Sequence, residues 1–297
     1  MDFRRAVFAG YPDRVAERRE AGSARVRLAS GTGAVIGPES GVHDGEFLVA
    51  IDVQAPPSGQ SRKKGDEPRI RLASLVERAW LQPNRSEVVH RLDRDSGVVR
   101  ASRIDSYDAL VLAEHPSSPD PEVAAGLLAD AWLERGPRHT DTQLLHRLRF
   151  AGQEVDVADL ARHAARRARS LHDIELADGL PSDVARVLDR DAPETLRVPS
   201  GRSIRLEYDA DGRVSAAVKL QELFGLAETP RLGVNHEPVR FALLAPNGRP
   251  VQMTRDLRSF WNRTYPEVRK ELRARYPKHP WPEDPWSATP TARAKRS

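Results

Sequence analysis

The chain has 297 residues, of which 39% are hydrophobic and 30% are charged, and its formal net charge is +4. This length and composition predict a folded protein with two domains and wide solvated surfaces, because the apolar fraction exceeds that of a disordered chain. The sequence has no cysteine, which excludes disulfide frameworks, thiolate metal sites and cysteine nucleophiles. The absence of cysteine also favours a reducing cytoplasm as the location, and no apolar run approaches the roughly 18 residues of a membrane span, so we expect no membrane partner.

Short strands dominate residues 1–116. A helical segment over 3–21, divided at Pro12, precedes strands at RVRLAS, AVIG and EFLVAIDVQ. Residues 69–80 form a strand that passes into a helix, and three more strands follow at EVVHRLD, GVVRASRID and DALVLAE. Several short strands with one helix in about a hundred residues are typical of a small OB-type barrel.

Two loops in this first half are informative. Gly31 and Gly33 are interpreted as a turn and not as a phosphate-binding loop, because β-branched residues follow them where a helix would be needed. Residues 54–68 have Pro, Gly, Ser and charged residues without an apolar anchor, which predicts an exposed loop.

The stretch HPSSPDP at 115–121 is a linker candidate that divides the chain into domains of 1–116 and 117–297. Helices are expected at 122–134, 141–151 and 156–171. The third carries Arg162, Arg166, Arg167 and Arg169, interpreted as a solvated face with nucleic-acid contact as the alternative.

The rest of the second domain mixes helices and strands. A short helix at 182–188 precedes strands at ETLRVP, SIRLEY, RVSAAVKL and RFALL, with a turn at Asp211-Gly212. The helical turn QELFGL is expected to bury Leu223, Phe224 and Leu226. The predicted fold class is therefore α+β, with an N-terminal OB-like small β-barrel followed by a mixed α+β C-terminal domain.

Residues 243–286 carry the strongest local signals. Asn247-Gly248 lies between two apolar runs and predicts a hairpin turn with positive φ angles. Thr254 is the expected cap of one short helix, and Thr264 with Glu267 predicts a capping box that starts a second. The prolines Pro277, Pro280, Pro282 and Pro285 predict an extended, polyproline-like tail.

This stretch, with FAGYPDRVAERR at 8–19, VPSG at 198–201 and KLQELFGLAETP at 219–230, resembles the C-terminal region of bacterial HrpB-type ATP-dependent helicases of the DEAH/RHA group. The resemblance covers nearly the whole chain. It implies an OB-like domain, a family-specific C-terminal domain, RNA as ligand, and helicase motor domains as partners in cis or in trans. ATP and magnesium would enter only through those motor domains.

Catalytic and metal motifs are absent from the sequence. No Gly-Lys pair occurs, so the chain has no phosphate-binding loop for ATP, and it has neither a GxSxG elbow nor an HExxH zinc motif. We therefore predict no catalytic residue, no metal site and no cofactor in this chain. Whether it contributes to an enzyme depends on its motor domains.

Positive charge concentrates at the C-terminus, where residues 254–297 include 11 basic and 5 acidic residues. Cations for phosphates and rings for bases suit a single nucleic-acid strand. The predicted contacts are Arg255, Arg258, Arg263, Arg269, Lys270, Arg273, Lys278, Trp261, Tyr265 and Trp281, with Arg275, Tyr276 and Trp286 nearby.

The helical pattern divides these predicted contacts into buried and exposed positions. Trp261 shares an apolar face with Leu257 and Phe260 and is expected in the core, whereas Arg258, Arg269 and Arg273 should point outward.

Two functions remain open. The first is a nucleic-acid-binding and regulatory module, inactive as an ATPase by itself. The second is a scaffold, in which QELFGL and the Pro-Trp tail pack against the motor or another protein. A free-standing hydrolase is a distant third possibility. We expect a monomer.

Overall fold

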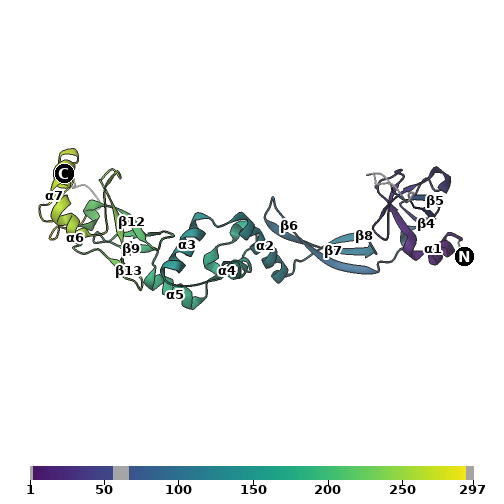
Figure 1. Ribbon diagram of the computed structural model, residues 1–297, viewed down its shortest axis with the longest axis horizontal. Coiled ribbons are helices and arrows are strands. Elements are labelled where there is room, and N and C mark those ends of the chain that lie inside the picture. Colours follow the sequence, from purple (N-terminus) through teal and green to yellow (C-terminus); the bar gives the residue numbers. More distant parts are fainter. Residues whose placement is uncertain (1–2, 56–66, 292–297) are drawn as a thin grey trace. The chain divides into compact units, whose positions relative to one another are not determined.

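Figure 1 shows the computed structural model of the chain, which describes residues 3–55 and 67–291. The chain forms two compact units, one of residues 1–95 and 99–124 and the other of residues 96–98 and 125–297. The boundary lies within the first helix after the Pro/Ser-rich stretch. Most of the predicted loop at 54–68 lies outside the described residues.

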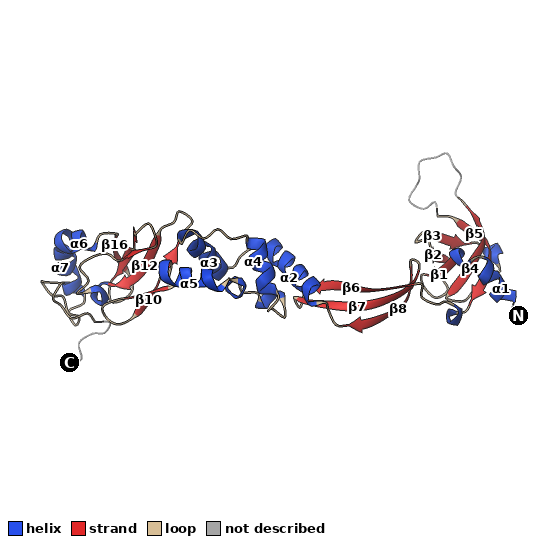
Figure 2. Cartoon of the chain, turned by 90° about the horizontal axis from the view of Figure 1, so that it is seen from below, coloured by secondary structure: helices blue, strands red, loops and turns tan. Residues whose placement is uncertain are grey.

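The first unit contains a closed barrel with the strand order β1-β2-β3-β5-β4 (Figure 2). β3 and β5 are parallel, and β1 closes the barrel by pairing with β4, where Val15 lies opposite Val49. The predicted OB-like barrel and α+β class are confirmed. The strands are β1 (Val15–Arg18), β2 (Arg25–Leu28), β3 (Gly33–Ile36), β4 (Phe47–Gln54) and β5 (Arg69–Val76).

The N-terminal segment differs from the prediction. The helix α1 (Phe3–Gly10) and the 3-10 turn η1 (Pro12–Arg14) agree with a helical segment divided at Pro12, but residues 15–18 form β1 and not helix. Residues 15–18 form a strand because they pair with β4, which lies some thirty residues away in the sequence. Local periodicity does not report a pairing over that distance.

Alternation within the strands creates two apolar layers. Ala16, Leu48 and Ile70 belong to a cluster inside the barrel. Val15 and Phe47, their neighbours in sequence, belong to a second cluster that also receives Phe8 from α1, together with Leu110 and Leu112. Successive side chains of a strand point to opposite faces, so β1 and β4 are buried on both.

The three strands after the barrel form their own antiparallel sheet, in the order β6-β7-β8 (Figure 2). The strands themselves were predicted, but their assignment to the barrel was wrong. The five strands β1–β5 close on each other and leave no edge for a sixth. The bounds are β6 (Arg85–Asp93), β7 (Val98–Tyr107) and β8 (Leu110–Ser117), and the 3-10 turn η3 (Arg78–Trp80) precedes them.

The helical part of the second unit follows the prediction closely. Its helices are α2 (Pro121–Arg135), α3 (His139–Phe150), α4 (Val157–Ala165) and α5 (Ser182–Asp191), with the 3-10 turns η4 (Leu171–Asp173) and η5 (Leu176–Gly179). Asp156 caps α4 by accepting the Ala158 N–H at 2.8 Å. α4 ends at Ala165, before the predicted Leu171, because the chain tightens there into a turn in which Arg167 N–H donates to Ala164 O.

A four-stranded sheet in the order β11-β12-β15-β16 follows, with two small two-stranded sheets. The strand predicted at SIRLEY is divided into β10 and β11, and Asp211-Gly212 turns between β11 and β12 as predicted. Leu223 and Phe224 are fully buried as predicted, whereas Leu226 is only half-buried. The elements are β9 (Thr195–Arg197), β10 (Ser203–Arg205), β11 (Glu207–Tyr208), β12 (Val214–Lys219), η6 (Leu220–Leu223), β13 (Arg231–Leu232), β14 (Glu237–Pro238), β15 (Arg240–Leu244) and β16 (Pro250–Thr254).

The predicted hairpin at Asn247-Gly248 joins β15 and β16. Ala245 N–H donates to Arg249 O at 2.8 Å, and Gly248 N–H donates to Ala245 O at 2.9 Å. Only Gly248 in this turn has a positive φ, of 85°. The connection is therefore a three-residue loop with one left-handed glycine, and the expected second positive φ is not needed.

Helical turns run without a break from Leu257 to Arg275, through α6 (Leu257–Ser259), the π-helical turn η7 (Phe260–Thr264) and α7 (Tyr265–Arg275). The predicted second start at Thr264 is wrong, because Thr264 has helical dihedrals and makes no capping bond. Pro266 has no N–H, and the widened π turn in front of it accommodates the missing bond without a break.

The cap of this helical run is Asp256 and not the predicted Thr254. The Asp256 carboxylate accepts the Ser259 N–H at 2.9 Å. The Thr254 hydroxyl instead accepts the Asp256 N–H at 3.0 Å. That N–H belongs to the cap residue itself, so Thr254 pairs with none of the free N–H groups of the first helical turn.

The tail after α7 folds back onto η6. Gly225 N–H donates to Pro285 O at 2.9 Å, and Thr291 N–H donates to Gln221 O at 3.1 Å. The described tail, residues 277–291, contains no helix, in agreement with the prediction, and the QELFGL block supplies backbone partners for it. Among the described residues, no helix combines the length and apolarity needed to cross a membrane.

Candidate nucleic-acid interface

The aromatic rings of the C-terminal stretch form a core cluster. Trp261, Tyr265 and Trp281 are 3%, 1% and 7% exposed. The rings of Trp261 and Tyr265 meet edge to face with their centroids 5.3 Å apart, and Phe224 of the QELFGL block packs against both. The expectation that Trp261 lies in the core is confirmed. In this conformation none of the three rings offers an open face to a base.

The polar atoms of these rings are also satisfied within the protein. Trp261 Nε1 donates to Leu226 O, Tyr265 OH to Pro282 O and Trp281 Nε1 to Tyr276 O, each at 2.9 Å. Burial raises the pKa of Tyr265, because its phenolate would lose hydration there.

Arg269 does not point outward as predicted. Its side chain is only 19% exposed, its Nε donates to Trp281 O at 2.9 Å, and its Nη2 lies 2.9 Å from a Glu283 carboxylate oxygen. Tyr265 faces inward one turn earlier, so position 269 shares the buried face of α7. Arg269 therefore joins α7 to the tail.

The remaining predicted cations are exposed. Arg258 pairs with Glu228, and Lys270 lies 2.9 Å from Glu267; exposed pairs of this kind contribute little and exchange readily. Within residues 3–55 and 67–291, no ion pair engages four of the predicted cations. These four, Arg255, Arg263, Arg273 and Lys278, are called the C-terminal basic surface below.

The barrel carries a second group of cations that the sequence reasoning missed. Arg25 of β2, Val35 of β3 and Arg69 of β5 lie side by side across three strands. Their neighbours Val26 and Ile70 point into the barrel and are fully buried, so the arginines point outward. The available signal was the alternation RVR and RIR, two cations flanking a core residue.

Two of these arginines have carboxylate partners. Arg69 makes a two-pronged bond to Glu39, at 3.0 and 2.7 Å, and this bond lowers the pKa of Glu39. Arg25 Nε lies 3.8 Å from Glu67.

Three further arginines on the same side are exposed: Arg19, Arg27 and Arg71. Arg27 lies opposite Glu17 of β1. None of the three makes an ion pair within the described part of the chain. Arg19, Arg25, Arg27, Arg69 and Arg71 are called the barrel arginine face below.

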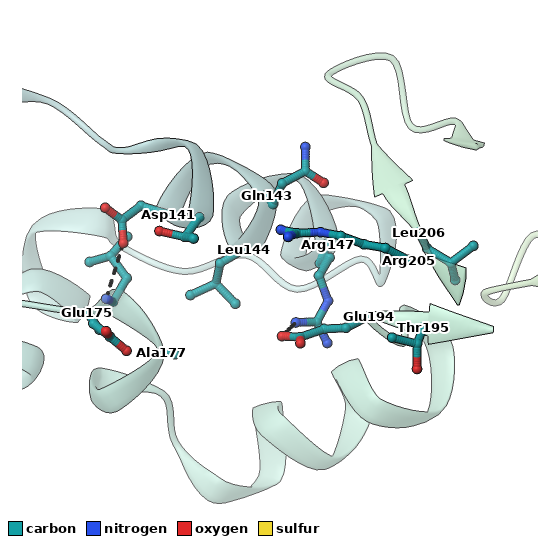
Figure 3. Close-up of a pocket in the computed structure, with 12 residues that line it drawn as sticks. Asp141, Gln143, Leu144, Arg147, Glu175, Ala177, Glu194, Thr195, Arg205 and Leu206 are labelled. Carbon is teal, nitrogen blue, oxygen red and sulfur yellow. Dashed lines mark hydrogen bonds and ion pairs between the residues drawn. The ribbon is translucent and has the colours of Figure 1, made fainter. Parts of the chain in front are cut away.

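A cavity of about 490 Å³ opens between α3, η5 and the β9–β10 hairpin in the second unit (Figure 3). Arg147 is buried there, with Nε donating to Ala192 O at 2.7 Å and Nη1 to Glu194 at 2.6 Å. Asp141 accepts the Arg138 N–H at 3.0 Å. The residues that line the cavity carry both signs of charge, so a polyanion has no electrostatic preference for this cavity. Arg147 connects α3 to the β9–β10 hairpin.

No group of His, Asp and Glu residues in the described ranges is placed to hold a metal ion.

Comparison with known proteins gives one family. Residues 157–285 match the family model described as ATP-dependent helicase C-terminal. The ATP-dependent RNA helicase HrpB of Escherichia coli (strain K12) is 40% identical over 135 residues, which are 45% of this chain and 17% of that protein.

Two crystal structures are similar to most of the chain. One, of the E. coli DExH-box NTPase HrpB, gives a TM-score of 0.52 at 27% identity and covers 98% of this chain and 39% of that one. Another, of the E. coli DEAH/RHA helicase HrpB, gives 0.45 at 25% identity and covers 93% and 38%. The chain spans less than half the length of each relative, and its residues 157–285 match the C-terminal region of this helicase family.

Proposed function

We propose that this chain is a nucleic-acid-binding, regulatory module of an HrpB-type helicase, with single-stranded RNA as its ligand and no ATP hydrolysis of its own. The sequence contains no Gly-Lys pair for a phosphate-binding loop. The E. coli relative is an ATP-dependent RNA helicase. ATP and magnesium would act at motor domains, in cis or in trans, and the work would take place in the cytoplasm.

The barrel arginine face is the observation that carries this proposal. OB-type barrels bind oligonucleotides over strands 2 and 3 and the adjoining loops, and here β2 presents Arg25 and Arg27. Arg71 adds a third exposed guanidinium from β5. Guanidinium groups form the forked bonds that phosphates accept, so a strand laid across β2, β3 and β5 would find its backbone partners there.

The C-terminal basic surface is the second contact in this proposal. It retains Arg255, Arg263, Arg273 and Lys278 of the predicted set, and Arg258 and Lys270 can join after exchanging their exposed pairs. Arg269 and the three buried rings act in folding.

The test compares two double variants of the full chain, Arg27→Ala with Arg71→Ala and Arg255→Ala with Arg273→Ala. Binding of fluorescein-labelled oligouridine is followed by polarisation between about 50 and 200 mM salt. Each lost phosphate contact flattens the slope of log affinity against log salt by about 0.7 for a single strand. We expect the barrel variant to lose about 1.4 in slope, and the C-terminal variant to show a second, separate loss.

Unchanged affinity and slope in both variants, with unfolding curves intact, would contradict the proposal. A loss in the C-terminal variant alone would move the main contact from the barrel to α7.

A scaffold is the second candidate function, and the packing of the tail favours it. QELFGL and the Pro-Trp tail bind each other and enclose Phe224, Trp261 and Tyr265, which is how a rigid platform is built. A scaffold would bind separately produced motor domains in sedimentation velocity while showing no salt-dependent affinity for RNA.

A further inference from the structure

The segment from Arg162 to His172 is a cationic stretch of the second unit. It includes four arginines and two histidines and no carboxylate. Leu160, Ala161, Ala164 and Ala165 form the buried face of α4, so the arginines interspersed with them point to solvent. Arg162, Arg166, Arg167 and Arg169 are called the α4 arginine cluster.

Nearby carboxylates leave much of this charge unbalanced. Asp159 pairs with Arg162, and Asp173 accepts the Ser170 hydroxyl at 2.8 Å. Arg167 and Arg169 are exposed, and the described residues supply no ion-pair partner for either.

The backbone that carries the cluster is held firmly. Arg135 Nη1 donates to Leu171 O at 3.4 Å, and Arg138 Nη1 donates to His172 O at 3.3 Å. Arg138 also bonds Ile174 O. Arg166, Arg167 and Arg169 therefore follow α4 on a hydrogen-bonded turn, and Arg135 and Arg138 hold the segment directly after it. A preformed surface loses less entropy when it binds a polyanion.

Helix stabilisation accounts for only part of the cluster. Cations in the last turn interact favourably with the helix dipole, and Arg162 serves this purpose in α4. The effect falls off within one turn, and Arg169 lies four residues beyond the helix end. The helix dipole therefore does not account for Arg169.

The chemistry of the neighbourhood identifies the kind of anion. No Phe, Tyr or Trp occurs between Phe150 and Tyr208, so the cluster has no ring of its own on which a base could stack. Arginine side chains contact phosphate oxygens, and a surface without rings gives an unpaired base nothing to stack on. We propose that the α4 arginine cluster is a further phosphate-binding surface for the RNA backbone, separate from the barrel. This inference rests on the proposed function and adds a contact on the second unit, in addition to the C-terminal basic surface.

The test uses the full chain with Arg167→Ala and Arg169→Ala together. The matched control is Arg149→Ala with Arg197→Ala, which removes the same charge from two exposed arginines on the same unit. Oligouridine affinity should fall about tenfold at low salt in the cluster variant, and its salt slope should flatten by about 1.4. The control should stay within about twofold, and Arg167→Lys with Arg169→Lys should keep most of the affinity, because a phosphate accepts a point charge.

The barrel variant Arg27→Ala with Arg71→Ala is measured alongside. If the cluster variant behaves like its control while the barrel variant weakens binding, this inference is overturned and the proposed function stands. If the unmodified chain shows no salt-dependent RNA affinity, both are overturned. Thermal unfolding by circular dichroism confirms that each variant is folded, and Arg167→Gln with Arg169→Gln replaces the alanine pair if it is not.

Discussion

Tyr265 is nearly inaccessible to solvent, and its single polar atom is bonded to Pro282 O. Tyr265→Phe removes that hydroxyl and should lower the free energy of unfolding by about 1 kcal/mol, the usual net contribution of one hydrogen bond.

Trp261→Ala leaves a cavity beside Phe224 and should lower the free energy of unfolding by about 3–5 kcal/mol. Urea denaturation measures both, with Arg263→Ala as a surface control. A neutral Trp261→Ala would indicate an exposed ring.

Glu222 presents a different case, a carboxylate that is 1% exposed. It accepts from Arg202 Nη1 at 3.0 Å and from Ser200 Oγ at 3.3 Å, which fixes the VPSG loop to η6. Arg202→Ala leaves this buried charge without its cation and should cost about 2 kcal/mol, less than a fully buried pair because Arg202 is itself exposed. Arg205→Ala is the control in the same urea series, and an equal loss in both would contradict this account.

The Arg69–Glu39 pair can be tested by titration. The hydrogen bond from Arg69 lowers the pKa of Glu39. The pair therefore adds to the free energy of unfolding above the ordinary pKa of a glutamate, and this stabilisation is lost as the pH falls through the lowered pKa. Arg69→Ala should raise the pKa of Glu39 back toward its ordinary value. Carboxyl carbon shifts followed by NMR between acid and neutral pH measure this. Arg27→Ala should leave the Glu39 titration nearly unchanged.

At the scale of elements, the positions of the strands were easier to predict than the pairing between them. The alternation around Val26 and Ile70 is local and was recognised as strand, whereas the separation of β6–β8 from the barrel depends on pairing between distant segments. The inward position of Arg269 was missed for a similar reason. Arginine on a helix is usually solvated, and only the folded tail supplies Trp281 O and Glu283 as its partners.

Gly179 tests the packing of η5 on α4. A Cβ at this position would collide with the backbone of Leu160 and Ala164. Gly179→Ala should therefore destabilise the second unit by about 1–3 kcal/mol, the cost of overpacking. Gly126 of α2 is the matched control, because a Cβ there meets nothing within 4 Å, and Gly126→Ala should stabilise its helix by up to about 1 kcal/mol. Thermal unfolding separates the two, and similar shifts in both would contradict the close packing.

For the molecule as a whole, absence of ATP hydrolysis is the main prediction. Phosphate release with ATP and magnesium should equal that of a heat-treated control, with or without oligouridine, because the sequence has no Gly-Lys pair. A malachite green assay measures this. Turnover that survives repurification would contradict the prediction, whereas activity that appears only after motor domains are added would agree with it.

The closure of the barrel by β1 and β4 limits how this protein can be cut into pieces. A fragment that begins after Arg18 would lack β1 and would leave β2 and β4 with unpaired backbone along one side. Such bare strand edges template pairing with other chains, so that fragment should aggregate even though most of its core residues remain. A fragment meant to contain the barrel by itself therefore has to begin early enough to include α1 and β1. A boundary chosen from the glycine-rich turns between the later strands would omit β1.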